Sequence, residues 1–367
     1  MYLSIHRKKV RHAAYIVIFP VLIMSVLSLL PGCFRSEPVT GPGGPEVSGD
    51  FPGDTGTDPE ETGDSGPPVN LVLCPLSGDM VPEGTTDRRP LAIMIENAPA
   101  ARPQSGLDKA DVVYEILAEG AITRFLAIFL HGDTEEAGPV RSARPYYIER
   151  MFEYNAMYAY CGGSEAAKNM VRREGVASLD EFGVGRQAYW RIKGRKAPHN
   201  LYADTRKLRD VGAKRGYEKT VELPEFQFLA EGKENKEGIT SGEVTVHYPR
   251  SFSTVRWEYD DKQKLYLRHQ GGSEHRDAVT DKQLTGSNII VQYTNTKVID
   301  NEGRREIDMV GRGRAVLFTG GKAYTGTWAK KSMRAQTYFY GENGEELKLN
   351  PGQTWIEVVP ARTTVDY

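Results

Sequence analysis

Residues 111–132, DVVYEILAEGAITRFLAIFLHG, contain two apolar stretches on either side of Glu119 and Gly120. In residues 112–117, nearly all side chains are apolar, at the odd-numbered and at the even-numbered positions alike. Successive side chains of a strand point to opposite faces, so a strand of this composition must be buried on both faces. We therefore expect strands over 111–120 and 121–132, joined by a turn at Glu119–Gly120, inside a sheet that is covered on both sides.

The sequence around this pair predicts further strands and three helices. PLAIMIE (90–96) and AMYAYC (156–161) are typical of short buried strands. A helix is expected to begin near 142–145, because proline suits a first turn. Ser164 and Asp204 are candidate N-caps for two more helices, which Gly175 and Gly216 would end. Strands and helices are interspersed, so residues 71–222 are predicted to form a layered N-terminal α/β sandwich domain.

The pattern changes after residues 225–243, where periodicity is lost and charge and glycine increase. Beyond this boundary the chain has short stretches rich in β-branched and aromatic residues, such as EVTVHYP and NIIVQYT, separated by turn signals. Residues 243–367 are therefore predicted to form a strand-rich C-terminal domain, and the fold class of the whole chain is α+β.

The N-terminus has the pattern of an export signal. A basic segment precedes an apolar run over 13–30, which ends in Leu30-Pro31-Gly32-Cys33. This ending resembles a bacterial lipobox, so 1–32 is predicted to be a lipoprotein signal peptide and Cys33 the lipidated residue. The alternative is an uncleaved membrane anchor. Both interpretations place the protein at the extracytoplasmic face of the cell membrane.

Residues 33–70 are rich in glycine, proline and acids and nearly free of apolar side chains, which predicts a disordered tether. Four of the 47 Lys and Arg residues precede Cys33, and 33–70 holds one more with eight of the 49 acids. The remainder therefore carries 42 bases and 41 acids, a balance that argues against nucleic-acid binding. Cys74 and Cys161 could form a disulfide or remain buried thiols, and the sequence leaves both open.

Positive charge is concentrated in GPVRSARPYYIER (138–150). A cation at a helix start is electrostatically misplaced unless an anion lies between it and the helix. We therefore expect an anion site of five residues: Arg141, Arg144, Ser142, Arg124 and Arg102. The alternative is an internal clamp, in which Glu115, Glu119 and Glu149 neutralise the same arginines.

Two catalytic interpretations are also compatible with the sequence. Glu115 and Glu119 could act as the paired carboxylates of a glycoside hydrolase, although on one strand their Cα atoms would be about 13 Å apart. His199, which precedes Asn200, could act as a general base. The spacing of His, Cys and acids fits no metal motif, so we expect neither a metal nor a cofactor.

Several long segments resemble one family, the YerB-like bacterial lipoproteins. These are ARPQSGLDKADVVYEILAEGAITRFLAIF, GPVRSARPYYIE and KAPHNLY, followed by GRGRAVLFTGGKAYTGTWAKKS and ELKLNPGQTWIEVVP. The resemblance covers roughly residues 74–360, and it implies an exported lipoprotein of two adjoining domains with layered sheets and helices. It supplies no catalytic residues. The polar positions that match are Arg102, Gln104, Glu115, Glu119, Arg124, Arg141, Ser142, Arg144, His199 and Asn200.

The first functional hypothesis is a non-enzymatic, membrane-anchored module of the cell envelope. It would bind or regulate an anionic wall component or a wall-synthesis protein through the arginine cluster, with Gln104, Glu115, Glu119, His199 and Asn200 as supporting polar residues. The alternatives are an envelope glycan hydrolase or transferase, and a structural scaffold with an internal Arg–Glu clamp.

Overall fold

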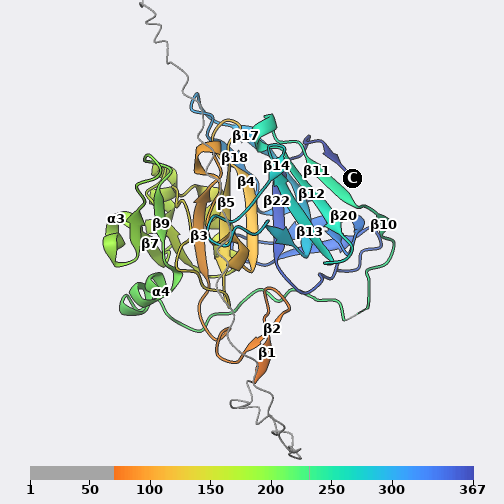
Figure 1. Ribbon diagram of the computed structural model, residues 1–367, viewed down its shortest axis with the longest axis horizontal. Coiled ribbons are helices and arrows are strands. Elements are labelled where there is room, and N and C mark those ends of the chain that lie inside the picture. Colours follow the sequence, from red (N-terminus) through yellow and green to blue (C-terminus); the bar gives the residue numbers. More distant parts are fainter. Residues whose placement is uncertain (1–69, 231) are drawn as a thin grey trace, which may run out of the picture. The chain divides into compact units, whose positions relative to one another are not determined.

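The structure is a computed structural model that describes residues 70–230 and 232–367 (Figure 1). The predicted signal peptide, Cys33 and nearly all of the predicted tether lie outside these residues. Of the described residues, 15% are helical and 39% are in strands, which confirms the α+β class.

The helices are α1 (Pro145–Glu153), α2 (Glu165–Arg173), α3 (Glu181–Val184) and α4 (Thr205–Lys214). The strands of the first half are β1 (Leu71–Leu73), β2 (Met80–Pro82), β3 (Leu91–Glu96), β4 (Val112–Leu117), β5 (Thr123–Phe129), β6 (Met157–Tyr160), β7 (Ser178–Asp180), β8 (Tyr189–Arg191) and β9 (Leu201–Ala203). Those of the second half are β10 (Ile239–Thr240), β11 (Glu243–Val246), β12 (Val255–Asp260), β13 (Leu265–Gln270), β14 (Ser273–Glu274), β15 (Thr285–Gly286), β16 (Asn288–Thr294), β17 (Thr296–Val298), β18 (Arg305–Ile307), β19 (Gly311–Thr319), β20 (Lys322–Lys330), β21 (Thr337–Gly341), β22 (Thr354–Pro360) and β23 (Val365–Asp366).

One 11-stranded sheet runs through both halves of the chain, in the order β10-β20-β19-β16-β22-β4-β5-β3-β6-β7, with β21 beside β20. The two halves meet where β22 pairs in parallel with β4, placing Glu357 opposite Glu115. On its other edge β22 pairs in parallel with β16. A second sheet of six strands has the order β14-β13-β12-β11-β23, with β15 beside β13.

The large sheet separates two hydrophobic cores. On one face it packs against the six-stranded sheet, where the ring centroids of Trp257 and Trp355 are 5.2 Å apart. On the other face it packs against α1, and the Tyr147 hydroxyl donates to the Ile116 carbonyl at 2.7 Å. Every residue of β4 and β5 is buried. The prediction that this pair lies in a sheet covered on both sides is therefore confirmed.

The local predictions also agree with the structure. The Ser164 hydroxyl accepts from the Ala167 amide at the start of α2, and Asp204 accepts from two amides at the start of α4. The turn between β4 and β5 brings the Ile122 amide to the Glu119 carbonyl at 3.1 Å. Glu119 therefore lies in this turn, beyond the end of β4.

Two further observations concern anchoring and thiols. Over residues 70–230 and 232–367, no helix is long and apolar enough to span a membrane. Cys74 and Cys161 are both free thiols, Cys74 fully buried and Cys161 partly buried.

Candidate functional site

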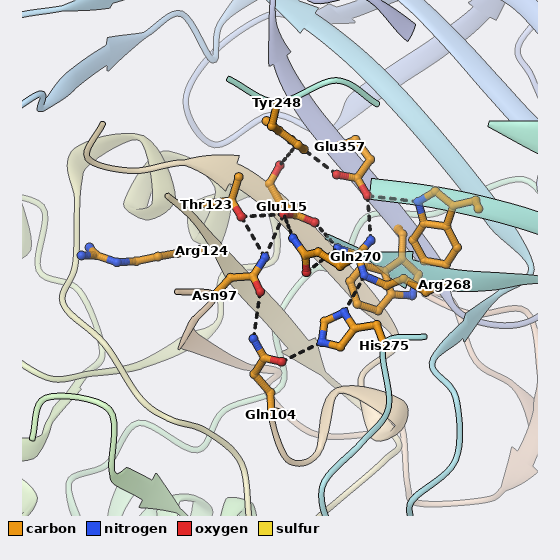
Figure 2. Close-up of polar contacts among 12 residues, drawn as sticks. Asn97, Gln104, Glu115, Thr123, Arg124, Tyr248, Arg268, Gln270, His275 and Glu357 are labelled. Carbon is orange, nitrogen blue, oxygen red and sulfur yellow. Dashed lines mark hydrogen bonds and ion pairs between the residues drawn. The ribbon is translucent and has the colours of Figure 1, made fainter. Parts of the chain in front are cut away.

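Three ionisable side chains lie fully buried between the two sheets, where an apolar core would be expected. Arg268 of β13 forms ion pairs with Glu115 of β4 and, at 3.0 Å, with Glu357 of β22. Its guanidinium also lies against two indole rings, 4.6 Å from the centroid of Trp355 and 4.9 Å from that of Trp257. This inner network, Arg268 with its two glutamates, joins the two halves of the chain (Figure 2).

The Glu115 carboxylate is held by neutral donors as well as by Arg268. Asn97 Nδ2 donates to it at 2.9 Å, the Thr123 hydroxyl at 2.5 Å and Gln270 Nε2 at 3.2 Å. A buried carboxylate keeps its charge only where such donors replace water. Figure 2 shows these side chains converging on Glu115: Thr123 from β5, Gln270 from β13 and Asn97 from the segment after β3.

Glu357 is in a different environment. Burial, together with the charge of Glu115, raises its pKa to about 8. The Tyr248 hydroxyl lies 3.0 Å from Glu357 Oε2 and 3.4 Å from the Glu115 carbonyl oxygen, but it has one proton to donate. A protonated Glu357 satisfies both contacts, because its carboxyl donates to the hydroxyl, which then donates to the carbonyl. Near neutral pH the protonated Glu357 therefore adds no negative charge to the inner network.

His275 extends the inner network in its neutral form. Burial and the positive charges of Arg268 and Arg102 lower its pKa well below the ordinary value. Its Nδ1 accepts from Arg268 Nε at 2.9 Å, so the proton is on Nε2, which donates to Gln104 Oε1 at 2.6 Å. Gln104 in turn donates to Asn97 Oδ1 at 2.9 Å. The predicted residue Gln104 is thus linked to the inner network through His275.

Three of the four predicted arginines, Arg124, Arg141 and Arg144, gather on the opposite face of the large sheet. Successive residues of β5 point to opposite faces, so Thr123 faces Glu115 while Arg124 points away, as Figure 2 shows. Arg124 Nη2 donates to Glu119 Oε2 at 2.7 Å, and Arg144 Nε donates to Glu119 Oε1 at 2.5 Å. The Glu119 carboxylate therefore accepts hydrogen bonds from two guanidinium groups beside the start of α1.

Arg141 lies beside this group and is less completely engaged. Its Nε is 3.1 Å from Glu96 Oε2, an ion-pair distance without hydrogen-bond geometry. Glu96 Oε2 also lies 2.8 Å from His199 Nδ1. Burial lowers the pKa of Arg141, and the charges of Arg124 and Arg144 oppose its two nearby glutamates. We call Arg124, Arg141, Arg144, Glu96, Glu119 and His199 the outer cluster.

The remaining predicted residues lie elsewhere or contribute differently. Arg102 donates to Asn97 Oδ1 at 3.0 Å and to the Phe252 carbonyl at 2.7 Å, and burial lowers its pKa to about 10. Ser142 offers its carbonyl, not its hydroxyl, to Arg124 at 3.3 Å. Asn200 accepts from Arg191 at 3.2 Å. Arg102, Ser142 and Asn200 therefore have separate partners, and only the Ser142 carbonyl reaches the outer cluster.

The two carboxylates considered for glycan hydrolysis have different surroundings. Glu115 is fully buried and is held by Arg268, whereas Glu119 is partly exposed and pairs with Arg124 and Arg144. The catalytic use of paired carboxylates requires both to reach one substrate bond. This geometry gives no support to that use.

Sequence reasoning did not find Arg268 or Glu357. The sequence did contain one signal for Arg268. It alternates with Tyr266 and Gln270 on the buried face of β13, so it is a charged residue at a core-facing position. It also missed a second buried group in which Lys330 Nζ lies 2.9 Å from Glu153 Oε2 and Arg150 pairs with the same carboxylate.

The comparisons assign the chain to a family. A profile described as "Protein of unknown function (DUF3048) N-terminal domain" matches residues 76–218, and the corresponding C-terminal domain profile matches 244–356. The chain belongs to this two-domain family.

A Bacillus subtilis (strain 168) protein named as a lipoprotein, YerB, is 34% identical over 291 residues, covering 79% of this chain and 86% of that protein. The crystal structure of YerB from Bacillus subtilis superimposes with a TM-score of 0.73 at 32% identity, covering 81% of this chain and all of the other.

Proposed function

We propose that this protein is an exported lipoprotein, anchored through Cys33, whose outer cluster binds an anionic group of the cell envelope. The name of the Bacillus subtilis relative and the lipobox-like sequence before Cys33 support the anchoring. On this proposal, residues 33–70 would connect the lipidated Cys33 to the folded part of the chain.

One observation carries the binding proposal. Within the described part of the chain, the Arg141 guanidinium makes an ion pair with Glu96 but no hydrogen bond, although its side chain is only 22% exposed. Buried polar groups normally have partners, so the buried Arg141 Nε, which makes no hydrogen bond, is a donor that a ligand could use. The outer cluster also holds three arginines against two glutamates, an imbalance that an added anion would correct.

The ligand class follows from these donors. A guanidinium presents two parallel N–H groups that match a phosphate or carboxylate. We therefore assign phosphate or carboxylate groups of envelope polymers as the ligand. An internal clamp that binds no ligand would also pair its arginines with Glu96 and Glu119. The experiment must therefore distinguish a binding site from an internal clamp.

The test is titration calorimetry of the full chain, in detergent, with a glycerol-phosphate polymer and separately with a uronic-acid polymer. Loss of one charge-assisted hydrogen-bonded pair costs about 1.5–3 kcal/mol, so Arg141→Gln should weaken binding about 10- to 100-fold. Arg172→Gln, which removes an exposed arginine from α2, is the matched control and should change affinity less than about 2-fold.

The internal clamp gives a different result. Neither polymer would bind the wild-type chain, and Arg141→Gln would change only the melting temperature. That pair of results would overturn the binding proposal. Equal loss in Arg141→Gln and Arg172→Gln would also contradict it, because the attraction would then be general rather than local.

A further inference from the structure

Three metal-ligating side chains meet at one end of β4 and β5, away from the residues discussed above. Cys74 follows β1, Asp111 precedes β4 and His131 follows β5. One ligand atom from each side chain lies within 4.8 Å of the other two. Their separations in sequence, 37 residues between Cys74 and Asp111 and 20 between Asp111 and His131, match no local metal motif. The fold alone brings them together.

The carboxylate of Asp111 is fixed in orientation. Its Oδ2 accepts the Leu130 backbone N–H at 2.6 Å, which turns Oδ1 toward the other two groups. Oδ1 lies 3.3 Å from Cys74 Sγ and 2.5 Å from His131 Nδ1. A backbone donor on the second oxygen is the kind of support that orients a monodentate metal ligand.

The donor set and spacing suit zinc. Thiolate, imidazole and carboxylate are the three zinc ligands used by proteins, with bonds of about 2.0–2.3 Å. A tetrahedral ion with such bonds holds its ligand atoms about 3.3–3.8 Å apart. The separation between Cys74 Sγ and Asp111 Oδ1 already fits. The contact between Asp111 and His131 must widen by about 1 Å, which the partly exposed imidazole is free to do.

We propose that Cys74 Sγ, Asp111 Oδ1 and His131 Nδ1 bind one Zn²⁺ ion, with water as the fourth ligand. Cys74 and Asp111 are fully buried, while the His131 side chain is 29% exposed and gives the ion and its water a route to solvent. On binding, the Cys74 thiol and the protonated His131 imidazole each release one proton to solvent, because the thiolate and the neutral imidazole are the ligands. The ion would join the segment before β4 to the segments that follow β1 and β5.

The test uses the full chain, stripped with a chelator, equilibrated with Zn²⁺ and passed through a desalting column. Metal content is then measured by mass spectrometry. Wild type should retain about one Zn²⁺ per chain, and Cys74→Ser and His131→Gln should retain at least 10-fold less. Cys161→Ser removes the other free thiol and should retain the wild-type amount.

A second measurement needs no site variant and so does not depend on how Cys74→Ser folds. Co²⁺ added to the stripped wild-type chain should give a sulfur-to-metal charge-transfer band in the near ultraviolet, and Zn²⁺ should abolish it. The same band should appear in Cys161→Ser. A wild-type chain that retains no zinc, or gives no thiolate band with Co²⁺, would overturn the proposal and leave an Asp111–His131 ion pair with an adjacent thiol.

Discussion

Glu115 of β4 and Arg268 of β13 are 153 residues apart in the sequence and form an ion pair in which both side chains are fully buried. The pair crosses the core between the two sheets, with Glu357 on the other side of the guanidinium. Burying charge costs free energy that neighbouring donors must offset. The inner network is therefore sensitive to the loss of any one member.

Removing the cation should be severely destabilising. Arg268→Met leaves the Glu115 carboxylate buried without a counter-charge, and we expect the free energy of unfolding to fall by about 3–5 kcal/mol. Urea denaturation at pH 7 measures this. Arg256→Met is the matched control, because Arg256 lies on the neighbouring β12 and pairs with glutamates that are more than half exposed. It should cost less than about 1 kcal/mol. Equal effects of the two changes would contradict the buried ion pair.

Stability should fall as pH rises through neutrality, because of Glu357. Its pKa is raised from an ordinary value of 4.5 to about 8 in the folded protein. Between these values the folded state holds a proton that the unfolded state has lost. The stabilisation that the protonated Glu357 adds to the free energy of unfolding is thus complete below pH 4.5. It is lost as pH rises toward 8, at up to about 1.4 kcal/mol per pH unit.

Glu357→Gln keeps the neutral form at every pH and should flatten this dependence. Unfolding free energies at pH 5.5, 7 and 8.5 for wild type and variant provide the measurement. Glu258→Gln, at an exposed position of β12, should retain the wild-type slope. A slope unchanged in Glu357→Gln would show that another group titrates in this range.

Glu119 should affect stability and binding in opposite directions. Glu119→Gln removes the carboxylate shared by Arg124 and Arg144, and we expect a loss of about 1–3 kcal/mol in unfolding free energy. The same change leaves two guanidinium groups without a counter-charge, so affinity for a phosphate polymer should rise several-fold. Thermal unfolding and calorimetry on one preparation test both effects. Weaker binding in the variant would mean that the arginines act only as an internal clamp.

Gly326 of β20 should tolerate no side chain. A Cβ atom there would lie 1.8 Å from the Tyr340 carbonyl oxygen of the neighbouring β21, so the two strands would have to separate. Gly326→Ala is expected to cost about 1–3 kcal/mol. Gly194→Ala is the control, because a Cβ there meets no atom within 4 Å. The melting temperatures of the two variants should differ clearly.

Much of the fold could be predicted because local chemistry determines it. The strands around 91–96, 112–117 and 123–129, and the helix caps at Ser164 and Asp204, follow from apolar patterning and from short-range hydrogen bonds. These features depend on residues close together in sequence. They can therefore be predicted even when the contacts between distant residues are unknown.

The site was harder to predict, because it depends on strand pairing over long distances. Nothing local indicates that β22 lies beside β4, or that β13 covers them, so the partnership of Glu115 with Arg268 and Glu357 could not be derived. The clustering of Arg141 and Arg144 was visible in the sequence. Which glutamate pairs with which arginine could not be predicted from the sequence. In the structure, Glu96 pairs with Arg141 and Glu119 pairs with Arg144.

The position of β22 has a consequence for the order in which the chain folds. This strand, at residues 354–360, comes from the second half of the chain, yet it lies between β16 and β4 in the middle of the large sheet. Until β22 has docked, β4 and β16 each have an unpaired edge that could join a strand of another chain. The first half of the chain therefore cannot complete the large sheet alone, and the docking of residues 354–360 completes the native topology.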